Sequence, residues 1–246
     1  MITLESRDKV AVLRLENGVT NAINPEFVRQ ITQALAEVRE QYQGLVLLGG
    51  AKFFSIGFDL PALLPLDRPG MTRFFAEFEH MLLDLLRLPL PVACAITGHA
   101  IAGGTILALT GDFRFAAGGN KMVGLNEIRL GLPVPLLADL MLRQLVGDRA
   151  ANPLLYGGEL LTVSAAEEIG LLDKLVPEAE LEDYSVKKIA ELALFFRPAF
   201  AEIKANRVEP LLHRHHQYHQ AKNQSFLDCW FNPAVQEWLS DAAKKF

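Results

Sequence analysis

One acidic side chain, Glu127, stands in an otherwise apolar segment, residues 124–135, which reads GLNEIRLGLPVP. Leucine and isoleucine neighbours that desolvate a carboxylate raise its pKa above the usual value of about 4.3. Such a group can move a proton near neutral pH. The alternatives are a solvated glutamate or one paired with Arg129. The segment therefore indicates either a proton-transfer site or a glutamate without a role in catalysis.

Two glycine-containing segments could present backbone N–H groups to a ligand. In residues 98–113, GHAIAGGTILALTGDF, a strand is expected to run into glycines where a buried helix begins. The free N–H groups at such a point can bind an anion or form an oxyanion hole. In residues 53–60, FFSIGFDL, Gly57 between bulky residues predicts a backbone shape that a side chain would forbid. For residues 98–113 the alternative is close packing of a strand against a helix. For residues 53–60 it is an ordinary loop that buries apolar side chains.

The first of these segments is not a dinucleotide-binding fingerprint. Gly98, Ala100 and Gly103 miss the required glycine order, and no acid for a ribose follows at a suitable distance.

The elements that must position these segments alternate between strands and helices. Strands are expected at residues 10–15, 44–50, 92–104 and 114–117, and helices at residues 25–41, 71–86 and 105–113. Residues 51–64 show no clear period and predict a loop. This alternation indicates an α/β protein with largely parallel strands, and the pattern is helical from Leu181 onward.

Composition limits the partners and the compartment. The chain has 246 residues, half of them hydrophobic, and a net charge of −5, so it can bury a large core and shows no basic stripe for nucleic acid. Two cysteines, Cys94 and Cys229, are too few for a disulfide framework. No secretory leader pattern and no apolar run of membrane-spanning length is visible. We therefore expect a cytoplasmic protein.

Other polar and aromatic residues are expected to have structural roles. Four histidines within residues 213–219 have helical spacings that could bring two imidazoles to one metal ion, but no carboxylate or cysteine nearby completes a set. A polar helix face or subunit contact is the favoured alternative, and no metal is expected. His99, beside the glycine turn, could act as a base, but a buried, hydrogen-bonded structural residue is the favoured alternative. Packing or interface anchors are expected at Phe226, Trp230, Phe231 and Trp238.

In this order and spacing, the segments resemble the crotonase, or enoyl-CoA hydratase/isomerase, superfamily. The similarity covers nearly the whole chain and includes NAIN, FFSIGFDL, GHAIAGG, GDFRFAA, LTVSAAEEIGLLDKLVP and the helical tail. It implies an α/β fold, a crotonase-like spiral of ββα units, with a C-terminal helical region that builds homotrimers or stacked hexamers. It also implies a catalytic, acyl-coenzyme A-binding core at residues 1–190 and a helical region at residues 191–246.

The resemblance implies roles for residues of both glycine-containing segments. Family members hold the thioester oxygen with two backbone N–H groups, which map to Phe58 and Gly103. Backbone groups that bind the adenine end map to Ile56, Phe58 and Leu60. Many family members have alanine at the position of Phe58. Because the backbone N–H group binds the oxygen, the bulkier side chain keeps this contact but reshapes the pocket. Coenzyme A arrives as part of the substrate, and no separate cofactor is expected.

The acidic residues then distinguish the reactions of the family. Hydratases share two glutamates, of which the first maps to Ile106, an apolar residue, and the second to Glu127. The sequence GLNEIRLG resembles the surroundings of the single catalytic glutamate of Δ3,Δ2-enoyl-CoA isomerases, which moves a proton from C2 to C4 of a 3-enoyl thioester. The resemblance therefore implies an isomerase. The alternatives are hydration, thioester hydrolysis or C–C cleavage on the same fold, or a non-catalytic acyl-CoA-binding trimer.

Overall fold

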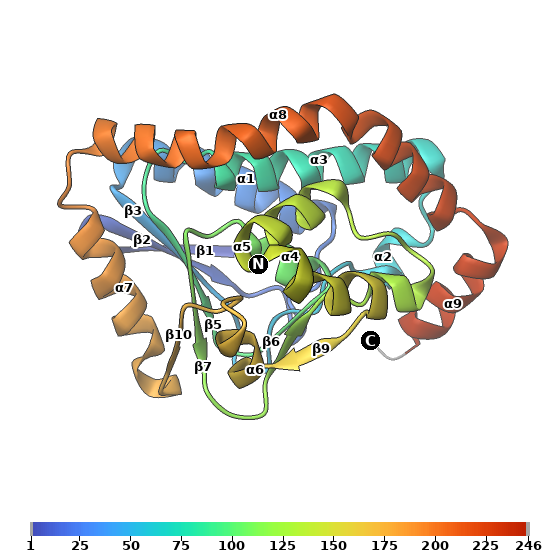
Figure 1. The fold of residues 1–246 in the computed structure, drawn as a ribbon, viewed down its shortest axis with the longest axis horizontal. Coiled ribbons are helices and arrows are strands. Elements are labelled where there is room, and N and C mark those ends of the chain that lie inside the picture. The colour runs from blue at the N-terminus through green and yellow to red at the C-terminus, as the bar shows by residue number, and fades with distance from the viewer. Residues whose placement is uncertain (1, 245–246) are drawn as a thin grey trace.

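The computed structural model describes residues 2–244 and contains two β-sheets surrounded by helices (Figure 1). The larger sheet has the order β1 (Ile2–Arg7), β2 (Val10–Leu15), β3 (Gly44–Leu48), β5 (Val92–Ile96), β7 (Phe113–Ala117) and β10 (Lys174–Val176). The smaller sheet has the order β4 (Phe53–Ser55), β6 (His99–Ile101), β8 (Met122–Gly124) and β9 (Leu160–Thr162). Neighbouring strands are parallel except in the β1–β2 and β8–β9 pairs, as the alternating pattern predicted.

The chain repeats one path through the two sheets. Three times it leaves a strand of the larger sheet, enters a strand of the smaller sheet and continues into a helix or helical turn. Strands β3 and β4 lead to α2 (Leu60–Leu63) and α3 (Arg68–Leu86), and strands β5 and β6 lead to α4 (Gly103–Leu109). Strands β7 and β8 lead to the 3₁₀ turn η1 (Glu127–Leu130) and α5 (Leu136–Gly157). The predicted spiral of ββα units is therefore confirmed. It places the carboxyl ends of β4, β6 and β8 side by side.

Local sequence explains where the first long helices begin. The side chain of Asn24 accepts a hydrogen bond from Phe27 N–H, and Pro25 occupies the first position of α1 (Pro25–Gln41), as predicted. Helix α3 begins three residues earlier than expected because the Asp67 side chain accepts from Gly70 N–H and caps the helix there. Both helices bury their apolar faces against the core.

Three expectations about strands were incomplete or wrong. Residues 92–104 do not form one strand: β5 and β6 belong to different sheets, and the chain changes direction near Gly98, where a Cβ atom would lie 2.4 Å from the carbonyl carbon of Lys52. Residues 51–64 contain β4 and α2, which are too short to show a sequence period. Strand β1 was not predicted, and it forms an antiparallel hairpin with β2.

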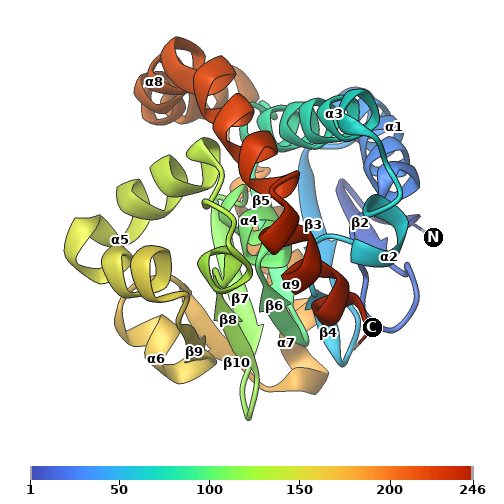
Figure 2. The same cartoon turned by 90° about the vertical axis from the view of Figure 1, so that its right-hand side faces the viewer.

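The last part of the chain is helical, as predicted. After α6 (Val163–Glu168) and the short turn η2 (Glu178–Glu180) come α7 (Leu181–Leu192), α8 (Arg197–Trp230) and α9 (Pro233–Ala243). Helix α8 runs along α3, and α9 folds back over α2 (Figures 1 and 2). Of the predicted helical region 191–246, residues 191–244 are described. Within residues 2–244, no helix combines the length and apolar character that a membrane span requires.

Candidate active site

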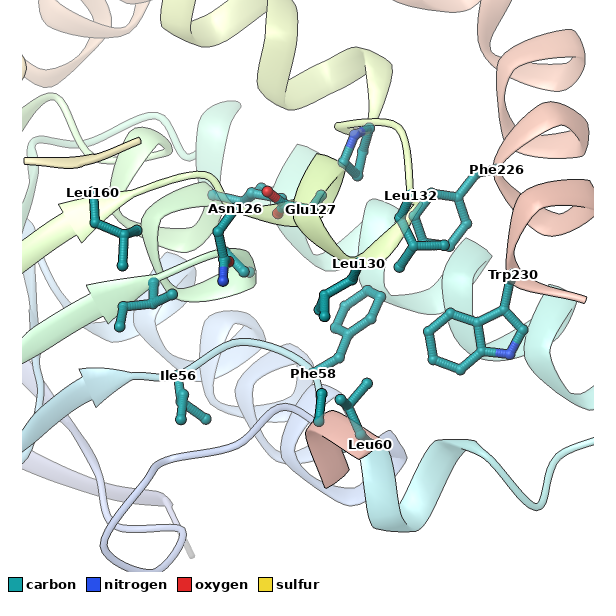
Figure 3. Close-up of a pocket in the computed structure, with 16 residues that line it drawn as sticks. Ile56, Phe58, Leu60, Asn126, Glu127, Leu130, Leu132, Leu160, Phe226 and Trp230 are labelled. Atoms are coloured by element: carbon teal, nitrogen blue, oxygen red, sulfur yellow. The ribbon is translucent and has the colours of Figure 1, made fainter. Parts of the chain in front are cut away.

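A cavity of about 310 Å³ lies at the carboxyl ends of β4, β6 and β8 and is closed on one side by α8 and α9 (Figure 3). Every site residue expected from the sequence contributes to its wall: Ile56, Phe58, Leu60, Gly103 and Glu127; Ile106, which maps to the first glutamate of hydratases, lines it as well. The wall is otherwise mainly apolar, with Leu130, Leu132, Phe226 and Trp230 on the side of the C-terminal helices. Parallel α/β sheets commonly bind ligands beyond the carboxyl ends of their strands.

Two backbone N–H groups at this cavity are available to a ligand. The loop around Phe58 pairs with Ile23, which donates to Gly57 O (2.7 Å) and accepts from Asp59 N–H (3.0 Å). In a parallel pairing of this kind, the N–H group of the middle residue, Phe58, points away from Ile23. Gly103 N–H begins α4 and so lacks a helical acceptor. Within residues 2–244, neither N–H group donates a hydrogen bond.

Glycine brings these two N–H groups close together. Gly57 has φ +97°, and a Cβ atom there would lie 2.9 Å from the nitrogen of Gly103. The prediction that a side chain at Gly57 is forbidden is confirmed. Ala102, before Gly103, has φ +50° and ψ −122°, an unfavourable conformation for alanine that its N–H···O bond to Gly124 (2.9 Å) helps to hold. Backbone strain of this kind is found most often at functional sites.

Glu127 is the first residue of η1 and is desolvated. Its relative exposure is 7%, and Oε2 is buried with no hydrogen-bond partner among residues 2–244. Burial raises the pKa of the carboxyl group from 4.5 to about 7, and a hydrogen bond from its own backbone opposes the shift. Arg129 points away and donates from Nε to Gly157 O (3.3 Å). The structure therefore excludes both alternatives for this acid, solvation and pairing with Arg129.

The remaining lining residues show what the sequence analysis missed. Glu127 is the one acidic side chain among the described residues that line the cavity, and Ile106 presents an apolar side chain there. Asn126 occupies the N-cap position of η1 but its side chain caps nothing, and its Oδ1 is buried without a described partner at the cavity. An asparagine directly before the candidate acid was the available signal for this residue.

Several other expectations concern residues with packing or structural roles. His99 Nδ1 accepts from Met122 N–H (3.0 Å), which confirms the predicted hydrogen bond, but the residue is only partly buried. Phe226 and Trp230 are packed within this chain, and Arg68 lies over the ring of Phe231. Trp238 is half exposed but adjoins Gly131, where a Cβ atom would lie 2.9 Å from its ring.

The prediction for the histidine cluster was wrong for one residue. His215 is buried, and its Nε2 lies 2.9 Å from Oε1 of Glu79 on α3. Asn223 donates to the other oxygen of Glu79 (2.9 Å). Because Glu79 is far away in the sequence, the histidine spacing gave no sign of this partner. Within residues 2–244, no group of three or more potential ligands is arranged to hold a metal ion.

The chemistry available to the cavity follows from these parts. Two unpartnered N–H groups can stabilise negative charge that develops on a carbonyl oxygen. A desolvated carboxyl group with a pKa near 7 can accept and return a proton. The apolar wall suits a hydrocarbon chain.

Comparisons with known proteins agree with this geometry. The family model described as "Enoyl-CoA hydratase/isomerase" matches residues 5–238. The human "Enoyl-CoA delta isomerase 1, mitochondrial" is 28% identical over 186 residues, which are 74% of this chain and 62% of that protein. "Enoyl-CoA delta isomerase 3" of Arabidopsis thaliana is 31% identical over 180 residues, 70% of this chain and 76% of that protein. The "Crotonyl-CoA hydratase" of Syntrophomonas wolfei is 33% identical over 193 residues, 77% of this chain and 74% of that protein.

The fold likeness extends over almost the whole chain. The crystal structure of human mitochondrial delta3-delta2-enoyl-CoA isomerase matches with a TM-score of 0.94 and 25% identity, and the match covers 99% of this chain and 97% of that one. The names of the relatives include both isomerases and hydratases, so similarity fixes the family and leaves the reaction to be argued from the site.

Proposed function

The chain belongs to the enoyl-CoA hydratase/isomerase family, and from that premise we propose that it isomerises 3-enoyl-CoA to 2-enoyl-CoA. The observation that carries the proposal is that, among residues 2–244, Glu127 is the one acid lining a cavity with two free N–H groups, and its buried Oε2 has no partner. Moving a double bond needs one proton acceptor that also returns the proton. Adding water needs a second acid to position and split the water molecule, and Ile106 occupies the place where hydratases are expected to have it.

The proposed reaction is balanced without any group beyond the substrate and the protein. The thioester oxygen accepts hydrogen bonds from Phe58 N–H and Gly103 N–H. The Glu127 carboxylate takes a proton from C2, and the electron pair of the broken C–H bond delocalises onto the thioester oxygen as an enolate. The protonated Glu127 then delivers the proton to C4, and the double bond moves into conjugation with the thioester.

Coenzyme A enters the proposal only as part of the substrate. Backbone groups of Ile56, Phe58 and Leu60, which lie in the loop and helix after β4, are the proposed contacts for its adenine end. A homotrimer or hexamer and a cytoplasmic location remain predictions. Hydration is the second candidate reaction, because relatives named as hydratases match this chain about as well as those named as isomerases.

The test is a reaction profile of the wild-type protein and Glu127→Gln. A 3-enoyl-CoA is offered and the ultraviolet absorbance of the conjugated product is followed, while hydration of a 2-enoyl-CoA and release of free thiol are assayed in parallel. We expect isomerisation by the wild type and a loss of at least about 10²-fold in Glu127→Gln with acyl-CoA binding retained. Predominant hydration, or a variant that keeps its rate, would refute the single-glutamate isomerase.

A further inference from the structure

The side chain of Phe58 projects into the cavity. Figure 3 shows its ring pointing from the loop towards Leu130, with Asn126 on one side of it and Trp230 on the other. The free N–H groups of Phe58 and Gly103 adjoin one another, and the cavity wall also carries buried polar atoms without a described partner, Oδ1 of Asn126, Oε2 of Glu127 and Nε1 of Trp230. The rings of Phe226 and Trp230, both on α8, line the cavity on the other side of Phe58 from Asn126. An apolar substituent that extends from the reaction site towards α8 would therefore meet this ring.

Neighbouring aromatic rings hold Phe58 in this position. Its ring meets Phe74 and Phe78 edge to face, with centroid distances of 5.1 Å and 5.0 Å and interplanar angles of 73° and 81°. The ring centroids of Phe75 and Phe226 lie 6.4 Å and 6.5 Å from that of Phe58. All four neighbours are at most 2% exposed, and edge-to-face contacts of this kind are attractive. The ring cannot turn away without losing contacts to α3 and α8.

Phe58 supplies both the N–H group that would bind the reacting carbonyl and the ring that limits the space beyond it. The distance between this carbonyl and the ring is therefore set by the length of one side chain. The cavity is also at the lower end of the range of about 300–1,000 Å³ that is usual for small-molecule sites. We propose that Phe58 is a specificity-determining residue that restricts the substrate to short acyl chains. The inference rests on the proposed function only in taking the ligand to be an acyl-CoA thioester.

Calorimetric binding of saturated acyl-CoA thioesters tests this proposal without any turnover. The ligands are butanoyl-, hexanoyl-, octanoyl- and decanoyl-CoA, and the proteins are the wild type, Phe58→Ala, Phe58→Leu and Leu160→Ala. In the wild type, we expect no gain in affinity beyond the shortest chains. In Phe58→Ala, we expect affinity to rise about fourfold for each further methylene group that enters the opened space, the factor that corresponds to about 0.8 kcal/mol.

Two of these variants serve as controls for folding and for position in the cavity. Phe58→Leu keeps an apolar side chain, so it preserves folding while giving an intermediate chain-length profile. Leu160→Ala removes an aliphatic side chain on the Asn126 side of the Phe58 ring, away from Trp230, and is expected not to change how affinity depends on chain length. Circular dichroism and thermal unfolding confirm that each variant is folded.

The possible outcomes separate this inference from the proposed reaction. A wild-type protein that binds octanoyl-CoA far more tightly than butanoyl-CoA, or a Phe58→Ala variant with the wild-type profile, would overturn the role of Phe58 while leaving acyl-CoA binding intact. Selective binding without any isomerisation would support the chain-length filter and refute the isomerase. Failure of every thioester to bind would overturn both.

Discussion

Two glutamates of this protein are equally buried and yet differ in their partners. Glu79 is 8% exposed and Glu127 is 7% exposed. Both oxygens of Glu79 have hydrogen-bond partners, His215 and Asn223, whereas Oε2 of Glu127 has none among residues 2–244. Native proteins nearly always satisfy buried polar atoms. The missing hydrogen-bond partner, rather than burial, therefore distinguishes Glu127, whose carboxylate is available for chemistry, from Glu79, which joins α3 to α8.

Asp112 extends the structural half of this comparison. Its Oδ2 accepts from Lys204 Nζ (2.7 Å) and from Val92 N–H (2.9 Å), and Lys204 also donates to Leu90 O (3.1 Å). Lys204, like His215, lies on α8. The hydrogen-bonded carboxylates of Glu79 and Asp112 thus hold α8 against the core. Helix α8 in turn supplies Phe226 and Trp230 to the wall of the cavity that Glu127 lines.

The largest stability effect is expected where a buried ion pair is broken. Lys204→Met leaves the 8%-exposed side chain of Asp112 without its main cation and should lower the free energy of unfolding by about 3–5 kcal/mol. Denaturant unfolding monitored by circular dichroism measures the change. Lys222→Met, an exposed position on the same helix, is the control and should lie within about 0.5 kcal/mol of the wild type. Equal effects of the two substitutions would show that the pair adds nothing to the attachment of α8.

The unpartnered Glu127 should reduce stability as the pH rises. Its pKa is 4.5 when solvated and about 7 in the folded protein, so between these values the folded state binds more protons than the unfolded state. The free energy of unfolding should therefore fall with pH across this window, by about 3 kcal/mol in total, with no cost below pH 4.5 and the full cost above pH 7.

Glu127→Gln removes this titration and isolates its contribution. The stability of the variant relative to the wild type should rise between pH 4.5 and pH 7 and then stay level. Denaturant unfolding at several pH values gives the difference curve. A difference that does not change with pH would mean that Glu127 is solvated or partnered in solution.

The same pKa predicts how turnover depends on pH. The proposed base must be deprotonated in the free enzyme, so kcat/KM should increase about tenfold per pH unit below pH 7 and level off above it. Initial rates with a 3-enoyl-CoA across this range test the prediction. A profile that levels off near pH 4.5 would assign the limiting ionisation to a solvated acid rather than to Glu127.

The smallest effect is expected at the partnered glutamate. Glu79→Gln leaves one of its two donors facing an amide N–H group, which should cost about 1–3 kcal/mol of stability while the rate of turnover per folded molecule stays unchanged. Thermal unfolding and the isomerase assay are compared with Glu77→Gln, an exposed position on the same helix. Should Glu79→Gln abolish turnover at full stability, the division between structural and chemical carboxylates would be incorrect.

Local sequence determined the parts of the protein that depend on near neighbours. Alternating strand and helix patterns indicated the α/β fold, and proline and asparagine set the start of α1. Glu127 was recognisable because it is an acid among apolar residues, and Gly57 because it lies between bulky ones. These features persist in the structure because periodicity, capping and glycine conformations act over a few residues.

Which polar groups have hydrogen-bond partners depends on contacts between segments that are far apart in the sequence. Glu79 and His215 are separated by 136 positions, so their pairing, which makes Glu79 structural, cannot be read from either segment. The division of residues 92–104 between two sheets depends on the close approach of Lys52 to Gly98. Among residues 2–244, the Phe58 and Gly103 N–H groups have no acceptor, because the nearby carbonyl groups of Ile23 and Gly124 accept from Asp59 and Ala102. Whether a polar group has a hydrogen-bond partner depends on contacts between distant segments. In this protein it distinguishes the groups that are available to a ligand from those that hold the fold together.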